Sequence, residues 1–382
     1  MPHKFIFNEN SHLGEGAIEE IPSEIKHRNL KKAFIVTDKD LCLAKITDKV
    51  TEILEKFSIP FEIFSDVEPN PSTDSVTKGV DAYKASGADF ILAVGGGSPI
   101  DTAKAIGIII TNPEYSDVTS LEGLKNVKNR PIPLFAVPTT AGSAAEATVF
   151  FVITDSSNKK KMVCICPQSI PVVAFVDPSM MISMPPALTS ATGMDALTHA
   201  IEGYITKGAT PLSDILCLNA IRLISSSLKN ATDGDKNSFA SLSLGQFIAG
   251  MGFSNSGLGI VHSMSHPLSA FYKTPHGVAN AIILPHVMEF NRDSVGDKYR
   301  HIAKAMGCEN VDALSEEEAK DAAINAVKEL SASIKIPSDL RDIASEEDVD
   351  FLSESAFYDA CRPGNPKEVT IDDIKKLYLK LI

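Results

Sequence analysis

The histidines of this chain recur at helical spacing beside one acidic residue, a pattern that is able to bind a metal ion. Asp195 and His199 are four residues apart, as are His262 and His266, so each pair projects from one face of a helix. Asp195 lies in a mostly apolar segment, where a carboxylate without a partner is costly. With His276, these side chains form a carboxylate and imidazole set suited to Fe(II) or Zn(II). The spacing leaves open which of the three later histidines would coordinate the metal.

A glycine-rich turn follows a short apolar run and has the composition of a phosphate-binding loop. Residues 90–105 read FILAVGGGSPIDTAKA. We expect a helix capped by Ser98, with Pro99 in its first position and Asp101 three residues after the cap. Glycines let backbone N–H groups approach an anion, and the helix dipole adds positive charge. The loop therefore predicts a pyrophosphate site, although it matches neither GxGxxG nor a Walker loop, and a tight turn without a ligand is the alternative.

A second turn rich in small and hydroxyl residues, VPTTAGSAAEAT, spans 137–148 and follows another apolar run. It offers the hydroxyls of Thr139, Thr140 and Ser143. Two such loops at strand ends favour a dinucleotide over a single phosphate. Asp38 ends the first strand, where its carboxylate can accept hydrogen bonds from an adenosine ribose and would repel a 2′-phosphate. Capping the next helix is the alternative role for Asp38.

Short apolar runs alternate with amphipathic stretches in the first half of the chain. The runs that we expect to form buried parallel strands are 33–37, 61–64, 90–94, 133–137 and 172–176, with helices such as 46–57 and 75–86 between them. This alternation predicts a doubly wound, Rossmann-like α/β domain over residues 1–184. Two further β-rich pieces, 149–154 and 162–166, predict an inserted hairpin.

The second half of the chain has the periodicity of helices. Segments with a 3.6-residue repeat are 187–206, 212–229, 238–252, 314–333 and 370–381. An all-α domain over residues 185–382 follows from this pattern, with the prolines of the MPP sequence separating it from the first domain.

Composition narrows the classes of partner and compartment. The 382 residues include 44% hydrophobic and 22% charged residues, which are ordinary values for a folded protein. A net charge of -13 disfavours nucleic acid and anionic membranes. The six cysteines form no CxxC pair, the N-terminus is too polar for a signal peptide, and no apolar run is long enough to span a bilayer. These features predict a cytoplasmic protein with reduced thiols.

Five long motifs occur in sequence along the chain: GGGSPIDTAKA, PTTAGSAAEAT, ATGMDALTHAIEGY, GMGFSNSGLGIVHSMSHPL and FYKTPHGVANAIILPHV. Over essentially the whole chain, they resemble the iron-dependent (group III) alcohol dehydrogenases. The resemblance implies a dehydroquinate synthase-like architecture, in which an α/β domain binds NAD(H), a helical domain holds Fe(II) or Zn(II), and the active site lies between them. It also implies a homodimer.

The same resemblance assigns roles to particular residues. The implied metal ligands are Asp195, His199, His262 and His276. The implied contacts to the dinucleotide are Asp38, Asn70, Gly96, Gly97, Ser98, Asp101, Thr139, Thr140, Ser143 and Lys161. His266 is expected near the nicotinamide and the substrate, where it could relay a proton. The expected walls of the substrate pocket are Phe150, Phe253 and Cys361.

The expected activity is reversible hydride transfer between NAD(H) and small aldehydes, primary alcohols or diols, with lactaldehyde and 1,2-propanediol as the expected pair. Relatives that act on 1,2-diols tend to carry Asn where this chain has Phe150. Ethanol, butanol and 1,3-propanediol are therefore the alternative alcohols. A synthase of the dehydroquinate type is disfavoured, because Lys273 is the lone basic residue near the histidines. A non-catalytic dinucleotide-binding protein is the alternative from another class.

Overall fold

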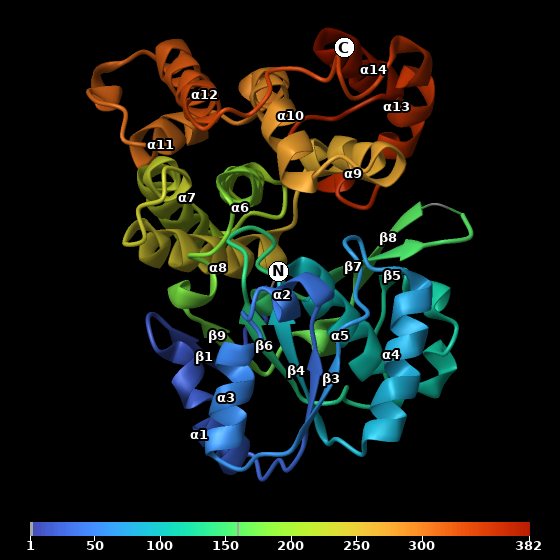
Figure 1. Ribbon diagram of the computed structural model, residues 1–382. Helices are drawn as coiled ribbons and strands as arrows, with labels where there is room; N and C mark the ends of the chain where they lie inside the picture. The colour runs from blue at the N-terminus through green and yellow to red at the C-terminus, as the bar shows by residue number, and fades with distance from the viewer. Residues whose placement is uncertain (1–2, 159) are drawn as a thin grey trace. The chain divides into compact units, whose positions relative to one another are not determined.

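The computed structural model describes residues 3–158 and 160–382, so the first two residues of the N-terminal segment discussed above lie outside it. The chain divides into two compact units (Figure 1). The first unit contains the described residues up to Thr140 together with Ala144–Ser183. The second contains Ala141–Ser143 and Met184–Ile382.

The first unit is built on six parallel strands in the order β1-β9-β6-β4-β2-β3. The strands of the unit, including β5, β7 and β8 outside this sheet, are β1 (Asn10–Leu13), β2 (Ala33–Val36), β3 (Phe61–Phe64), β4 (Phe90–Gly95), β5 (Gly123–Leu124), β6 (Leu134–Pro138), β7 (Phe150–Asp155), β8 (Lys160–Ile165) and β9 (Val173–Val176). Its α-helices are α1 (Ile21–His27), α2 (Lys39–Leu43), α3 (Asp48–Lys56), α4 (Thr73–Ser86) and α5 (Gly97–Thr111). The predicted doubly wound α/β fold is confirmed.

Each face of the sheet carries its own hydrophobic core, because side chains alternate along a strand. In β2, Ala33 and Ile35 pack with α1 and α3, whereas Phe34 and Val36 pack with α4 and α5. The predicted hairpin is also present, since β7 and β8 pair antiparallel, and β5 joins them to make a separate three-stranded sheet. Figure 1 shows α3 and α4 on opposite faces of the main sheet.

The start of α5 differs from the expectation. The helix begins at Gly97 and its N-cap residue is Gly96, so the prediction of Ser98 as the cap is wrong. Gly95 has φ of +158° and Gly96 is extended, and a Cβ on Gly96 would lie 3.1 Å from the Thr140 side chain. Glycine allows the chain to turn directly after β4 while passing close to the second loop, so the helix begins earlier than a serine cap would allow.

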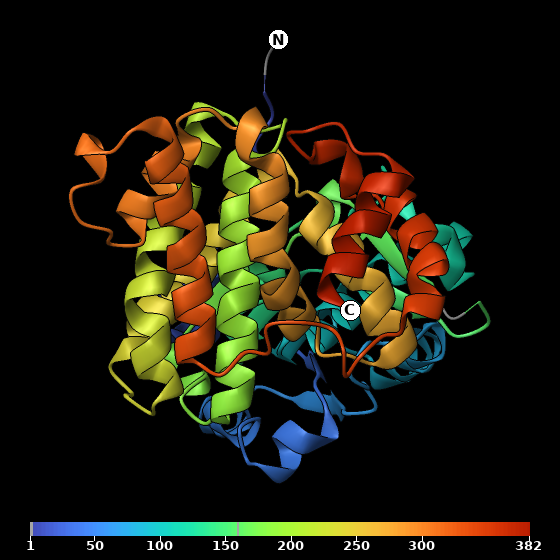
Figure 2. The same cartoon turned by 90° about the horizontal axis from the view of Figure 1, so that it is seen from above.

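The second unit is helical. Its α-helices are α6 (Pro186–Ile205), α7 (Pro211–Thr232), α8 (Ser238–Ser256), α9 (Ile260–Tyr272), α10 (His276–Asn291), α11 (Lys298–Ala305), α12 (Glu316–Ser333), α13 (Val349–Phe357) and α14 (Ile371–Leu381). The buried helix α6 packs against α7, α8 and α10. Figure 2 shows α6 and α10 side by side. Among the described helices, none has the length and apolar run that crossing a bilayer requires.

Candidate active site

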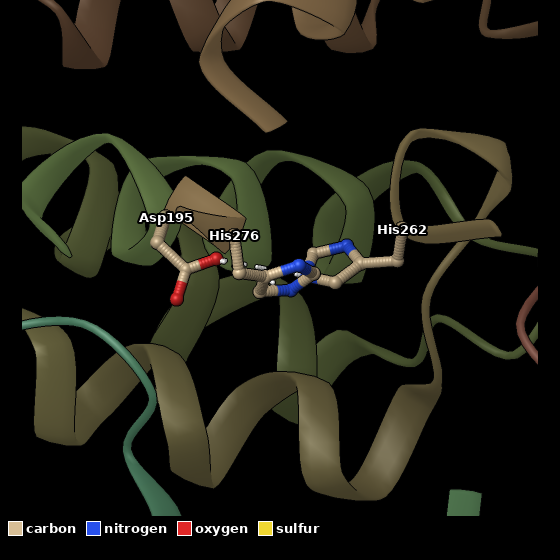
Figure 3. Close-up of side chains that lie close together, drawn as sticks. All are labelled: Asp195, His262 and His276. Atoms are coloured by element: carbon tan, nitrogen blue, oxygen red, sulfur yellow. Dashed lines mark ion pairs between the residues drawn. The ribbon is translucent and has the colours of Figure 1, made fainter. Parts of the chain in front are cut away.

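Three side chains predicted as metal ligands meet inside the second unit. Asp195 comes from α6, His262 from α9 and His276 from the first position of α10. The Asp195 Oδ1 atom lies 3.9 Å from His262 Nε2 and 3.8 Å from His276 Nε2. One ligand atom from each residue lies within 4.8 Å of the other two. Figure 3 shows the three side chains pointing toward one another, which is the arrangement that a single cation could bridge.

Close helix packing brings these residues together. Gly277 follows His276 at the start of α10, and a Cβ at this position would lie 2.0 Å from the Ala191 carbonyl oxygen and 3.2 Å from the Asp195 Cβ. No larger residue fits there without moving α10 away from α6. Gly277 therefore allows His276 to lie beside Asp195.

The fourth predicted ligand, His199, lies next to this group but outside the set of three converging ligand atoms. Its ring stacks on His262 with centroids 4.5 Å apart and on Phe253 at 4.2 Å. Its Nδ1 atom is buried, and none of the described residues provides it with a hydrogen-bond partner. Burial lowers the pKa of both His199 and His262 to about 4, so both rings are neutral at pH 7 and hold lone pairs for a metal.

Glu202 supports the metal group, although the sequence analysis did not assign it a role. Its Oε2 atom lies 2.6 Å from His262 Nδ1, and its Oε1 atom accepts a hydrogen bond of 2.8 Å from the Val261 backbone N–H. Burial raises the pKa of Glu202 to about 7. A carboxylate at Nδ1 fixes the proton there and leaves Nε2 as the metal-binding nitrogen. The position of Glu202 three residues after His199 was the available sequence signal.

His266 lies beside the metal group and has its own carboxylate partner. Its ring stacks on His276 at 5.3 Å, and its Nδ1 atom lies 2.7 Å from Asp359 Oδ2. The other oxygen of Asp359 accepts a 2.8 Å hydrogen bond from the Cys361 backbone N–H. Burial opposes ionisation of Asp359, but the charge and hydrogen bond of His266 lower its pKa to about 2. Cys361, an expected wall of the substrate pocket, thus lies next to Asp359, which was not predicted.

The donor set fits Fe(II) or Zn(II). Neutral imidazoles and one buried carboxylate are ligands that both metals accept, and the orphaned nitrogen of His199 is available for a cation. A second group of His266, Asp359 and Cys361 also has ligand atoms within 4.8 Å. In this second group His266 and Asp359 already form a hydrogen bond with each other. The group of Asp195, His262 and His276 is therefore the better candidate for a metal site.

The predicted dinucleotide residues of the first unit follow neighbouring parallel strands. Asp38 follows β2, Gly96 to Ser98 follow β4, and Thr139 and Thr140 follow β6. The carboxyl ends of parallel strands lie at one edge of a sheet. Strands β3 and β4 pair with opposite sides of β2, so the strand order changes direction at β2. Nucleotides bind at such topological switch points. Ser143 belongs to the three residues that group with the second unit.

Asp38 also acts as a helix cap. Its Oδ1 atom accepts a 2.8 Å hydrogen bond from the Leu41 backbone N–H at the start of α2, and burial raises the pKa of its carboxyl group. A capping oxygen at this site uses one side of the carboxylate. A carboxylate has about four acceptor positions, so capping leaves capacity for a ribose, and the two roles considered from the sequence are compatible.

The remaining predicted residues of this unit gather around β7. The Asn70 carbonyl accepts a hydrogen bond from Thr154 Oγ1 at 3.4 Å, and Lys161 pairs with Thr154 across the hairpin. Asp101 Oδ2 accepts a 2.9 Å hydrogen bond from the Val152 backbone N–H. Phe150 is the first residue of β7 and is half-buried.

The buried Lys104, which the sequence analysis did not single out, fixes the backbone at this point. Its Nζ atom donates hydrogen bonds to the carbonyl oxygens of Thr148 at 2.8 Å and Phe150 at 2.6 Å. The backbone position of the predicted pocket residue Phe150 is therefore set by a side chain of α5, the helix that begins at the glycine loop.

Two family profiles and several known proteins match this chain over most of its length. The sequence profile "Iron-containing alcohol dehydrogenase" matches residues 8–178, and the profile "Fe-containing alcohol dehydrogenase family, C-terminal" matches residues 189–382. Lactaldehyde reductase of Escherichia coli (strain K12) is 50% identical over 379 residues, which cover 99% of each chain. NAD-dependent methanol dehydrogenase of Bacillus methanolicus is 38% identical over 368 residues, covering 96% of each.

Solved structures agree as well. The crystal structure of a 1,3-propanediol oxidoreductase superposes with a TM-score of 0.97 at 37% identity, with complete coverage of both chains. An alcohol dehydrogenase from Oenococcus oeni gives a TM-score of 0.96 at 37% identity, again with complete coverage. The resemblance inferred from the motifs is confirmed. The chain belongs to the iron-containing alcohol dehydrogenase family and is an iron-dependent, NAD-linked alcohol dehydrogenase and aldehyde reductase.

Proposed function

We propose that this enzyme interconverts lactaldehyde and 1,2-propanediol. The observation that carries the metal-dependent part of this proposal is the convergence of Asp195, His262 and His276, whose ligand atoms lie within 4.8 Å of one another. The 50% identity to the lactaldehyde reductase of Escherichia coli supports the choice of substrate. We assign dinucleotide binding to residues 1–184, and metal binding and catalysis to residues 185–382.

The proposed iron ligands are Asp195, His199, His262 and His276. Bound iron supplies a Lewis acid at the substrate oxygen, and NADH supplies the hydride. Glu202 keeps the His262 proton on Nδ1 and so presents Nε2 to the metal. His266, held at Nδ1 by Asp359, uses its Nε2 atom to exchange the proton that the alcohol oxygen gains or loses. Phe253, stacked on His199, and Cys361 form walls of the substrate pocket.

The proposed dinucleotide contacts are Asp38, Asn70, Gly96, Gly97, Ser98, Asp101, Thr139, Thr140, Ser143 and Lys161. Their support is strongest along β2, β4 and β6, whose carboxyl ends lie next to one another. Asp101 reaches the backbone of β7 rather than an open position, so its contribution would be to hold the hairpin beside the glycine loop. The negative charge of the Asp38 carboxylate favours NAD(H) over NADP(H).

Phe150 favours a second candidate substrate class. An aromatic ring at this position offers no hydrogen bond to a second hydroxyl, so simple aldehydes such as acetaldehyde, propanal and butanal are the alternative substrates. The aldehyde related to 1,3-propanediol, 3-hydroxypropanal, places its hydroxyl one carbon further away. These substrates share the metal chemistry and differ in the contacts made by the carbon chain.

A substrate panel tests the proposal. Protein loaded anaerobically with Fe(II) is assayed through NADH absorbance with lactaldehyde, propanal, acetaldehyde and 3-hydroxypropanal. We expect turnover with all four and the highest kcat/KM with lactaldehyde. His262→Ala should lose iron and turnover but still bind NADH. His286→Ala, on the same helix as His276, is the matched control. Preference for propanal would move the assignment to the second class, and full activity of rigorously metal-free protein would overturn the role of the metal.

We also propose that the enzyme is a homodimer that works in the cytoplasm. The exposed strand β1 lies at the edge of the main sheet and leaves backbone groups open for pairing with a second copy. All six cysteines are free thiols, as in a reducing compartment. Light scattering during size-exclusion chromatography gives the mass in solution, and a monomer would contradict the first of these proposals.

A further inference from the structure

One amide nitrogen faces all three converging ligand atoms of the metal group. Asn280 lies on α10, one turn after His276, and its side chain is fully buried. Its Nδ2 atom lies 2.7 Å from Asp195 Oδ1 and 3.2 Å from the Nε2 atoms of His262 and His276. No role was assigned to this residue from the sequence.

The orientation of the amide follows from its surroundings. If the amide were reversed, its carbonyl oxygen would face the Asp195 carboxylate, and two acceptors would repel each other. The His262 Nδ1 atom is paired with Glu202, and the His276 Nδ1 atom lies 3.3 Å from Ser265 Oγ, so the Nε2 atoms carry the lone pairs. Among the described residues, Asn280 Oδ1 has no hydrogen-bond partner. The amide is thus held in place by the metal group itself.

The Asn280 amide has fewer N–H groups than the metal group has acceptor atoms. An amide nitrogen has two N–H groups, whereas the metal group presents three acceptors. One N–H donates to the carboxylate, and the other is shared between two imidazoles. The three side chains are therefore oriented toward one point, while their acceptor atoms receive fewer hydrogen bonds than they are able to accept. A cation can still bind there more strongly than the neutral amide does.

We propose that Asn280 is a positioning residue for the metal site, which aims Asp195, His262 and His276 at a common point before iron binds and thereby sets the affinity for iron. This inference rests on the ligand set proposed above. Groups that orient metal ligands typically change metal affinity by about 10- to 100-fold when removed. Asn280 acts through the three ligands and needs no contact with the substrate.

The test measures the dissociation constant of Fe(II) by anaerobic competition with a chelator. Asn280→Leu keeps the volume of the side chain and removes the donor, whereas Asn280→Ala also leaves a cavity. We expect both variants to bind iron about 10- to 100-fold more weakly. The visible bands of bound Co(II), which report ligand geometry, should differ from those of the wild type in both variants. Asn112→Ala removes a buried asparagine of the first unit and should leave the iron affinity and the Co(II) spectrum unchanged.

The outcomes separate this inference from the ligand assignment. Wild-type iron affinity and an unchanged Co(II) spectrum in Asn280→Leu would overturn the role of Asn280. A loss confined to Asn280→Ala would show that only packing matters and would also overturn it. If His262→Ala kept its iron, the ligand assignment itself would fail. Loss of iron in His262→Ala together with normal binding in Asn280→Leu would leave the ligands in place and reject this inference alone.

Discussion

His266 and Asp359 form a largely buried pair in which the histidine Nδ1 atom lies 2.7 Å from the aspartate Oδ2 atom. Ser263 Oγ, at 3.3 Å, and the Cys361 backbone N–H, at 2.8 Å, hold the other carboxylate oxygen. The pKa of Asp359 is about 2, because the favourable His266 contacts outweigh the cost of burial. An ionised Asp359 keeps a proton on Nδ1, so Nε2 is the nitrogen that can exchange a proton with the substrate.

Asp359→Asn should therefore lower kcat for aldehyde reduction by about 10- to 100-fold, because an amide can also donate to Nδ1 and no longer selects one tautomer. The KM for NADH should change little. Asp350→Asn, an exposed aspartate of α13 paired with Lys375, is the control. The measurement is steady-state kinetics of the wild type, Asp359→Asn and Asp350→Asn at saturating iron. A wild-type kcat in Asp359→Asn would show that Asp359 has no role in the mechanism.

Asp38→Asn tests cofactor choice without removing the helix cap, because asparagine caps a helix about as well as aspartate. Loss of the negative charge removes repulsion of a 2′-phosphate. The preference for NADH over NADPH should narrow by one to two orders of magnitude, which corresponds to about 1.4 kcal/mol for each tenfold change. The measurement is kcat/KM for both cofactors. Equal use of NADPH and NADH by the wild type would show that Asp38 does not select the cofactor.

Phe150→Asn tests the substrate pocket. A hydroxyl pressed against an aromatic wall without a partner loses hydration at a cost of about 1–3 kcal/mol. Asparagine supplies a partner, so the ratio of kcat/KM for lactaldehyde to that for propanal should rise roughly tenfold if half of this cost is recovered. Phe150→Leu, which remains apolar, should not raise the ratio. An unchanged ratio in Phe150→Asn would mean that this ring packs away from the substrate.

The half-buried Asp101 and the buried Lys104, both on α5, predict a pH dependence of stability. Burial raises the pKa of Asp101 from 3.8 to about 6, against the opposing charge of Lys104. Burial lowers the pKa of Lys104 from 10.5 to about 8, against the opposing charge of Asp101. Between pH 3.8 and about 6 the folded state binds more protons, so stability falls as pH rises. Between about pH 8 and 10.5 the unfolded state binds more protons, and stability rises with pH.

The double variant Asp101→Asn with Lys104→Met removes both titrations. The difference in urea midpoint between metal-free wild type and this variant should fall between about pH 4 and 6, stay level to about pH 8, and then rise. The hydrogen bonds lost in the variant add an offset that does not depend on pH. A constant difference across the whole range would show that neither group has a shifted pKa.

Much of the fold was predictable because buried parallel strands are continuous apolar runs bounded by aspartate, proline or glycine. The runs that became β2, β4 and β6 have this form. The edge strand β1 was not predicted, since its sequence NSHL lacks such a run and its pairing with β9 comes from the fold. Helix α9 was indicated only by the spacing of His262 and His266, and helix α10 was absent from the predicted segments, because Pro267 and Pro285 interrupt their periodicity.

The metal group was predictable in type, because histidines and a carboxylate at helical spacing have few other uses in an apolar segment. Its supporting residues were not. Glu202, Asn280 and Asp359 are common residue types, and their roles depend on which side chains the packing of α6, α9 and α10 brings within hydrogen-bond distance. The contacts of Glu202 with His262, of Asn280 with Asp195 and of Asp359 with His266 join residues 60 to 93 positions apart, so no local pattern encodes them.

The most direct test of the central claim is the position of iron. Crystals of anaerobically iron-loaded protein, measured on both sides of the iron absorption edge, give an anomalous difference map that locates the metal without reference to activity. We predict one peak per chain, about 2 Å from ligand atoms of Asp195, His199, His262 and His276. A peak instead among His266, Asp359 and Cys361, or one without His262 as a ligand, would contradict the account.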